Sequence, residues 1–297
     1  MGSLFLDLVQ VLIAGFGQGS IYALMALGLT LIYRSTTTLN FAQGALFMLG
    51  AFLTLELIMA GVPYLLAIGL ALVILAVLGL TIDKLAFQPL LKKDHVTQVF
   101  ATVAISFIIV GAVRFVTVDQ RGLPALLGGK GYLEIGGAVI NTQYLMMIAS
   151  LIVVGLLLAY FFQRTRIGLI IRACTDNLRG ADLVGINVKR VFAIMWGLGA
   201  VLAGLAGILA APTLLVSPDV GNTPLVIGLV AMALGGFGSI PGAVIGGLLM
   251  GLLEQFANFY VSTQLGAVAG FLVVLVLLIV RPNGIMGFRG IRLQVSR

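Results

Sequence analysis

Side chains that could carry out chemistry are few in this chain, and they do not form a catalytic set. The sequence has one histidine, His95, which follows Lys92, Lys93 and Asp94, and one cysteine, Cys174. A lone histidine among charged neighbours is typical of a solvated loop, and a single cysteine excludes a disulfide within the chain. The sequence contains no G-x-x-x-x-G-K-[ST] pattern, so it predicts no phosphate loop for ATP. We therefore expect no catalytic residue, no metal site and no cofactor bound by the chain itself.

Polar residues that could handle a solute lie at two interruptions of otherwise apolar runs, RSTTTLNFAQG (34–44) and GGFGSIPG (235–242). Within a bilayer, irregular backbone is tolerated only where it is buried in protein or lines a wet cavity. Transporters often place such breaks in repeat-related positions along their pathway. The alternative is that these side chains satisfy backbone groups at the breaks. The predicted translocation pathway comprises Ser20, Asn40, Gln43, Ser239 and Pro241.

Two glutamates occupy equivalent positions when the sequence is shifted by 198 residues. The shift lays 39–56 over 237–254, so that Gly44 falls on Gly242 and Glu56 on Glu254. Each glutamate then lies ~18 Å along a helix from its glycine, towards the outer face. We expect an internal repeat and an outer-face acidic pair that meets cationic groups of a solute or a docking protein. The alternative is that both are interfacial residues that face headgroups or pair with Arg114.

The composition is that of a membrane protein. The chain of 297 residues is 61% hydrophobic and 9% charged, whereas soluble domains carry about 25% charged residues. No segment shows the alternation of a membrane β-barrel. We expect an all-α polytopic membrane protein in one transmembrane domain, 1–297, with about 8–9 membrane helices that include broken or re-entrant elements. Apolar runs fall near 8–33, 38–60, 64–82, 96–118, 143–163, 191–215, 222–237, 242–262 and 264–281.

The positions of the basic residues predict the orientation. Lys and Arg gather in 83–95, in 164–190 and in the tail 282–297, and fewer lie around 119–142. Because cytoplasmic loops are enriched in Lys and Arg, we expect 119–142 to be external, 164–190 to be cytoplasmic, the N-terminus to be outside and the C-terminus inside. The repeat-like segments are then 8–82 and 222–281. The net charge of +7 is no argument for nucleic-acid binding.

One short apolar run does not fit a simple span. The run 222–237 is too short to cross ~30 Å as a straight helix, so we expect a half-helix that meets the glycine-rich turn inside the membrane. GLGAVLAGLAG (197–207) places Gly197, Gly204 and Gly207, with alanines, along one side of a helix, and GAVIGGLLMG (242–251) does the same with Gly242, Gly246 and Gly247. Small residues at this spacing let helix backbones approach closely, which predicts packing within the bundle, with lining of a solute route as the alternative.

The stretch RACTDNLRGADLVGINVKR (172–190) carries six charged residues in an apolar chain. Its pattern predicts a short surface helix with an apolar side and a polar side. Gly185 would end this helix in the left-handed conformation, and Ile186 and Val188 would follow as exposed apolar residues that suit a groove on a soluble partner. The alternative is a solvated loop. The apolar side would comprise Ala173, Leu178, Ala181, Leu183 and Val184, and the polar side Asp176, Arg179 and Asp182.

Three segments together resemble a known family. The segments 164–212, 29–52 and 225–254 are similar to the signature regions of bacterial ABC-transporter permeases for branched-chain amino acids, and the chain resembles the shorter, LivH-type subunit. In that family the cytoplasmic segment is a coupling helix that sits in a cleft of an ATPase subunit. Family members often carry an acidic residue and an alanine before the core of this helix. This chain has Asn177, Leu178 and Arg179 at those positions. The resemblance assigns ATPase coupling to Asp176, Asn177, Arg179, Ala181, Asp182, Gly185 and Ile186.

The resemblance also implies a function and a set of partners. The chain would be a permease, not an enzyme, of an importer for Leu, Ile and Val in the bacterial inner membrane, surrounded by membrane lipid. It would work with a second, LivM-like permease, two ABC ATPases that use ATP and Mg, and a periplasmic or lipid-tethered binding protein; no nucleic acid is involved. One alternative keeps the machinery and changes the solute to urea, short amides or other amino acids. Another is an ATP-independent channel or carrier, although no span centre carries an obvious ion-coupling Asp, Glu or His.

Overall fold

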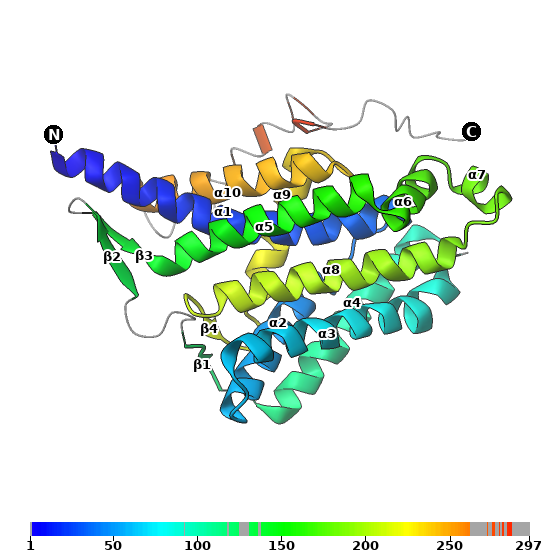
Figure 1. Ribbon diagram of the computed structural model, residues 1–297, viewed down its shortest axis with the longest axis horizontal. Helices are drawn as coiled ribbons and strands as arrows, with labels where there is room; N and C mark the ends of the chain where they lie inside the picture. Colours follow the sequence, from blue (N-terminus) through cyan, green and yellow to red (C-terminus); the bar gives the residue numbers. More distant parts are fainter. Residues whose placement is uncertain are drawn as a thin grey trace.

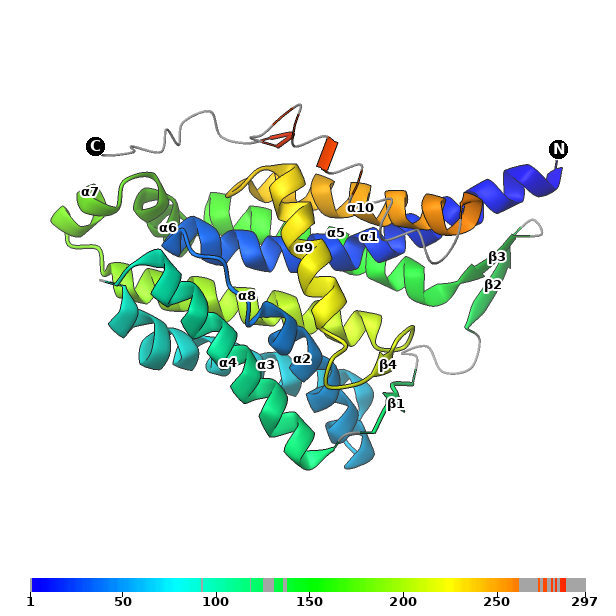
Figure 2. The same cartoon turned by 180° about the vertical axis from the view of Figure 1, so that it is seen from behind.

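A computed structural model describes residues 2–91, 93–117, 119–124, 131–135 and 138–261, together with 272, 275, 276, 279, 281 and 284–286. Most of the described chain is helical (Figures 1 and 2). The α-helices are α1 (Gly2–Thr36), α2 (Gln43–Met59), α3 (Tyr64–Ile82), α4 (His95–Val116), α5 (Thr142–Arg164), α6 (Arg166–Asp176), α7 (Leu178–Leu183), α8 (Val188–Ala210), α9 (Asn222–Gly235) and α10 (Ile240–Tyr260).

The helices confirm the prediction of a polytopic α-helical membrane protein. Six helical segments of the described chain are long and apolar enough to cross a membrane, and α2 and α9 are shorter apolar helices. The second of these segments, Tyr64–Leu90, is longer than expected, because α3 continues through a π-helical turn, η1 (Asp83–Phe87), and a 3₁₀ turn, η2 (Gln88–Leu90). The expected span 264–281 lies almost entirely outside the described residues.

The long helices run between two opposite ends of the molecule (Figure 1). One end, here called the α7 end, holds α6, α7 and the start of α8. The other, here called the strand end, holds four short strands that the sequence did not predict. The strands β2 (Tyr132–Ile135) and β3 (Ala138–Asn141) pair antiparallel, as do β1 (Arg121–Gly122) and β4 (Leu215–Val216). The expected external loop 119–142 therefore contains a small hairpin and a strand that ties it to the segment after α8.

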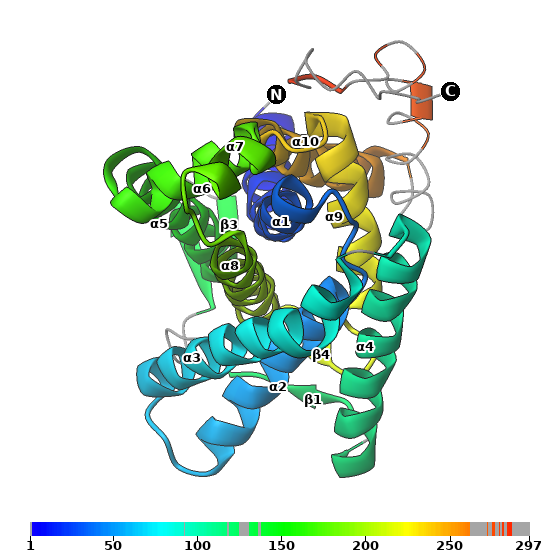
Figure 3. The ribbon, with the colours of Figure 1, turned by 90° about the vertical axis from the view of Figure 1, so that its right-hand side faces the viewer.

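The core of the bundle is built around α1 and α8. About 72% of the most apolar stretch of each is buried, compared with 11% for α4. Seen from the α7 end, α1 lies among α8, α9 and α10, while α3 and α4 lie further out (Figure 3). The peripheral helices expose large apolar side chains such as Leu65 and Phe107, as expected for surfaces in contact with lipid. The two central helices therefore fix the positions of the elements that surround them.

Glycines allow these central helices to approach closely, as the sequence predicted. A Cβ on Gly204 or Gly207 would meet α3 or the backbone of α2, and a Cβ on Gly247 would meet the backbone of α1 at Ala23. Such contacts leave no room for a side chain, because the neighbours are helix backbone or a buried leucine. The small residues of the sequence therefore serve packing within the bundle.

Both predicted interruptions are confirmed. The chain is non-helical at 37–42, between α1 and α2, and at 236–239, between α9 and α10. Thr37 has a positive φ of 54° and Gly236 one of 104°, conformations that end a helix. The helix α9 has 14 residues, which span ~21 Å, so the expected half-helix is also confirmed. It crosses the bundle obliquely in Figure 2.

Candidate functional site

At the first break, two buried amides are locked together. The Asn40 Nδ2 donates to the Gln43 Oε1 at 3.1 Å, and the Gln43 Nε2 donates to the carbonyl oxygen of Gly199 at 3.0 Å. A Cβ on Gly28 would overlap the Gln43 amide, so this amide fills a notch between α1 and α8. The Asn40 Oδ1 also accepts from the local amide of Ala42 at 3.0 Å, whereas the Gly199 carbonyl that Gln43 binds lies on another helix. Their role in a pathway remains a prediction.

The same break is bonded to α4 by two residues that the sequence analysis did not single out. The Thr38 hydroxyl donates to the Gln98 Oε1 at 2.5 Å, and the amide of Phe41 donates to the Thr102 hydroxyl at 3.1 Å. Gln98 and Thr102 are buried and lie four residues apart, on one face of α4. Two polar residues at this spacing in an apolar helix are the signal that would have identified them.

The second break is organised by a helix cap. The Ser239 Oγ accepts from the amide of Gly242 at 3.1 Å, and Pro241 lies in the first turn of α10, where its missing N–H costs nothing. Ser20 is fully buried and donates to the carbonyl oxygen of Phe16 at 2.7 Å within α1. The structure thus brings Asn40 and Gln43 together, whereas Ser20 and Ser239 each bond within their own helix.

The two glutamates have separate partners. Glu56 forms an ion pair with Arg121 of β1, with 3.0 Å between Oε1 and Nη1. The Glu254 Oε2 accepts from the Tyr22 hydroxyl of α1 at 2.6 Å. The alternative that paired them with Arg114 is wrong, since Arg114 binds Asp219 at 2.7 Å. The sequence could not have shown this, because the pairing depends on how the segment after α8 folds back beside α4.

The stretch 172–190 is not one surface helix, which corrects the expectation from its periodicity. Asn177 adopts an extended conformation, with φ −151°, and separates α6 from α7. Its Oδ1 accepts from the amide of Gly180 at 2.9 Å. An asparagine side chain is a preferred N-cap, so Asn177 starts a new helix where a continuous one was expected.

The predicted helix end at Gly185 is confirmed. Gly185 has φ 82°, its amide donates to the carbonyl of Asp182 at 3.0 Å, and the amide of Ile186 donates to that of Ala181 at 3.0 Å. These are the two bonds of a Schellman cap. The cap turns the chain back towards the bundle.

The exposed apolar residues of this segment are not those expected. Leu183 and Val184 are 88% and 76% exposed, whereas Ile186 and Val188 are half-buried against the core. The reason is the reversal of the chain after the cap at Gly185, which carries the two later residues inward. The short helix α7 therefore presents its last apolar residues to the surroundings.

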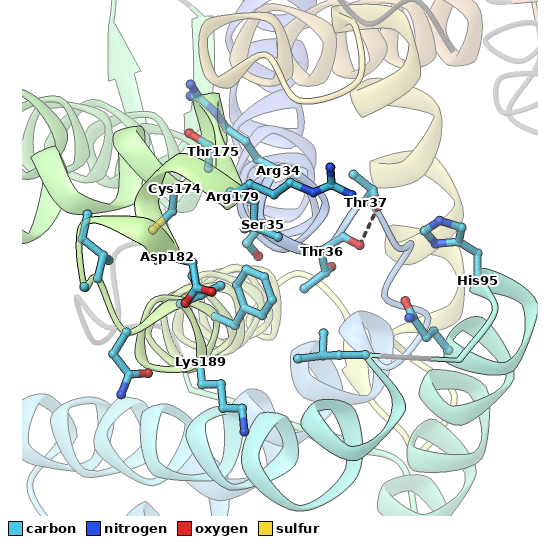
Figure 4. A pocket seen from close by; sticks show the side chains of 18 residues that line it. Arg34, Ser35, Thr36, Thr37, His95, Cys174, Thr175, Arg179, Asp182 and Lys189 are labelled. Atoms are coloured by element: carbon cyan, nitrogen blue, oxygen red, sulfur yellow. Dashed lines mark hydrogen bonds between the residues drawn. The ribbon is translucent and has the colours of Figure 1, made fainter. Parts of the chain in front are cut away.

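Behind α7 lies a cavity of about 1010 Å³ (Figure 4). Its walls come from the end of α1, the start of α4, and α6, α7 and α8. Cys174 on the α6 wall is buried, and burial raises the pKa of its thiol. At the start of α4, Asp94 accepts from the hydroxyl and the amide of Thr97, and these bonds lower the pKa of its carboxyl. The polar and charged lining residues are Arg34, Ser35, Thr36, Thr37, His95, Gln98, Cys174, Thr175, Arg179, Asp182, Asn187 and Lys189.

Comparison with known proteins decides the family. The family model described as "Branched-chain amino acid transport system / permease component" matches residues 11–286. The chain belongs to this family. It is 32% identical to the high-affinity branched-chain amino acid transport system permease protein LivH of Escherichia coli K12 over 97% of this chain and 98% of that protein. It is 30% identical to the permease BraD of Pseudomonas aeruginosa, over 94% and 95% of the two chains.

Two more distant similarities concern a permease for another solute and a solved structure. The ribose import permease RbsC of Escherichia coli K12 is 27% identical to this chain, over 81% of this chain and 75% of RbsC. The solved structure of PsaBC from Streptococcus pneumoniae in complex with Fab covers 95% of the permease and 97% of the matched chain at 14% identity, with a TM-score of 0.51. At that identity the likeness concerns the fold alone.

Proposed function

We propose that this permease imports branched-chain amino acids across the bacterial inner membrane, driven by ATP that separate subunits hydrolyse. The observation that carries the proposal is the near full-length identity to LivH and BraD, whose names state this transport. The permease's own sequence has no phosphate loop, in keeping with a subunit that moves solute and leaves ATP chemistry to partners.

The helix α7 is the surface that supports coupling to an ATPase. It is fixed at both ends, by the Asn177 cap and the Gly185 cap, and it exposes Leu183 and Val184. A short rigid helix with exposed apolar residues suits a groove on a soluble partner. The remaining coupling residues of the proposal are Asp176, Arg179, Ala181, Asp182 and Ile186.

The other partners follow from the same proposal. A second, LivM-like permease completes the membrane portion, two ABC ATPases use ATP and Mg at the α7 end, and a periplasmic or lipid-tethered binding protein delivers solute at the strand end. The basic residues of 164–190 support a cytoplasmic α7 end, an external N-terminus and a cytoplasmic C-terminus.

A different solute is the second candidate. The similarity to a permease named for ribose import shows that related chains serve solutes other than amino acids. Urea, short amides and other amino acids therefore stay as alternative cargoes, with the same ATP-driven machinery. An ATP-independent channel or carrier is the remaining alternative.

The experiment is uptake of labelled leucine into vesicles that contain the complete complex, with and without ATP. Isoleucine, valine, urea, acetamide and phenylalanine serve as competitors. We expect ATP-dependent uptake that isoleucine and valine block most strongly. Uptake that does not need ATP would establish the carrier alternative, and ATP hydrolysis stimulated only by another competitor would change the cargo.

Variants of α7 test the coupling surface within the same assay. Leu183→Ser removes an exposed apolar contact, and Leu169→Ser makes the same change on α6, where Leu169 is also exposed. We expect Leu183→Ser to lower ATP-dependent uptake and Leu169→Ser to leave it near the level of the unchanged permease. Equal effects of the two substitutions would argue against α7 as the ATPase contact.

A further inference from the structure

The cavity behind α7 joins charges of both signs with an apolar wall. Arg34, Arg179 and Lys189 line it with Asp182, and the apolar lining includes Ile186 and Phe192. Its volume, about 1010 Å³, is at the upper end of the ~300–1,000 Å³ typical of small-molecule sites. A molecule of amino-acid size would fit with accompanying water.

Arg179 and Asp182 are one helical turn apart, yet they do not bind each other. Opposite charges at this spacing often pair on a helix. The ion pairs of the described residues are Arg114–Asp219 and Arg121–Glu56, so the Arg179 guanidinium and the Asp182 carboxylate have no charged partner there. In Figure 4 Arg179 extends from α7 towards Thr36 and Thr37 at the end of α1, with Asp182 on the same wall nearer α8. An α-amino acid carries one charge of each sign, so its carboxylate and its ammonium each have a complementary side chain on this wall.

The apolar part of the wall adjoins these charges. Leu178 of α7, Ile186 after its cap and Phe192 of α8 line the same cavity. Ile186 and Phe192 also pack on the core of the bundle, so this surface is held in place. A branched aliphatic side chain of a bound amino acid would be removed from water by contact with this apolar surface. The charged groups of the same amino acid would then lie near Arg179 and Asp182.

We propose that this cavity binds a free α-amino acid, with its carboxylate on Arg179, its ammonium on Asp182 and its side chain on the apolar wall. The proposal rests on the proposed function, because it assigns the imported class of solute to a site at the α7 end. Two of its contacts come from α7 itself. A bound amino acid therefore adds bonds between the solute and the helix that meets the ATPase.

The test is equilibrium binding to the assembled permease–ATPase complex in lipid nanodiscs, without ATP and without the binding protein. The probes are leucine, 4-methylpentanoate (leucine without its ammonium) and 3-methylbutylamine (leucine without its carboxylate). Loss of one charge-assisted hydrogen bond weakens binding about tenfold or more. We expect Arg179→Gln to weaken the binding of leucine and of 4-methylpentanoate by that factor and to leave the binding of 3-methylbutylamine unchanged. Asp182→Asn should weaken the binding of leucine and of 3-methylbutylamine and leave the binding of 4-methylpentanoate unchanged.

Matched controls lie outside the cavity. Arg166→Gln on α6 and Asp119→Asn just before β1 remove the same charges from exposed residues that do not line the cavity, and both should bind leucine as the unchanged complex does. Arg179→Lys keeps the charge and should weaken leucine less than Arg179→Gln does, a difference that loss of folding would not produce.

Three results would overturn the proposal: no leucine binding by the unchanged complex, unchanged binding by both cavity variants, or equal weakening by the two controls. Leucine uptake is measured in parallel with the same complexes in closed vesicles, with ATP and the binding protein present. Normal uptake with unaltered binding by the variants would refute the cavity site alone, whereas absence of leucine uptake would refute the proposed function while the binding series still decides the cavity.

Discussion

The crossing of α2 over α8 provides the sharpest test of the packing. A Cβ on Gly50 would lie 2.5 Å from the Cα and from the carbonyl oxygen of Gly204, and 2.8 Å from its carbonyl carbon. Carbon atoms in ordinary contact are about 3.5–4.0 Å apart, so Gly50→Ala has to separate the two helices by ~1 Å. Overpacking costs about 1–3 kcal/mol, and backbone neighbours have no rotamer that could yield. We therefore expect a loss in the upper half of that range, about 2–3 kcal/mol.

The assay is thermal unfolding of the permease in detergent, followed by the fluorescence of Trp196, the single tryptophan, which is buried in α8. Domains of 150–250 residues lose about 2–4 °C per kcal/mol, so a loss of about 2–3 kcal/mol in Gly50→Ala should lower the Tm by ~4–12 °C. Gly155→Ala is the matched control, because nothing lies within 4 Å of a Cβ there. Alanine in a helix interior is favoured over glycine by about 0.5–1 kcal/mol, so its Tm should stay level or rise. Equal Tm values for the two variants would refute the close crossing.

Three further predictions concern the α7 end. Gly185→Arg strains the cap, because φ is 82° there, but leaves the bundle folded and inserted, since Gly185 is exposed with open space around it. It should abolish ATP-driven uptake in vesicles; normal uptake would contradict the coupling role. Asp94→Ala lowers the Tm at pH 7, and the difference from the unchanged permease shrinks as the pH falls below about 4. The reason is that the bonds from Thr97 lower the pKa of Asp94, so that Asp94 stabilises the fold most as a carboxylate and this contribution decreases on protonation; a difference that is as large at pH 3 as at pH 7 would argue against the cap. Maleimide labels Cys174 much more slowly in the native permease than in SDS. The rate of labelling in the native permease keeps rising with pH above the usual thiol pKa of about 8.5, because burial raises the pKa of the Cys174 thiol. Equal labelling rates in the two states would show an exposed thiol.

The local rules of the sequence predicted much of the helical framework. Apolar runs located the spans because a membrane helix needs a long unbroken run. The glycines of 235–242 and the polar residues of 34–44 predicted the two breaks. Gly185 predicted a helix end, since the cap needs a residue in the left-handed conformation. These features depend on residues that are close in the chain.

Contacts between distant segments could not be derived in the same way. The insertion of Gln43 between Gly28 and Gly199 needs three helices to be placed together, and no local pattern specifies it. The expectation of one surface helix over 172–190 was wrong because apolar periodicity was weighed above the capping ability of Asn177. The cavity behind α7 was not predicted at all, since its walls come from five separate helices.

The attachment of α4 has a mechanical consequence. This helix is little buried along its length, with Phe107 74% exposed near its middle, but it is bonded at both ends. Gln98 and Thr102 hold it to residues 38–41, and Arg114 holds it to Asp219. Its 22 residues make a rod of ~33 Å pinned at two points. If residues 38–41 move, either their hydrogen bonds to Gln98 and Thr102 break or α4 moves with them. In the second case, the same displacement reaches the segment after α8 at the other end of α4.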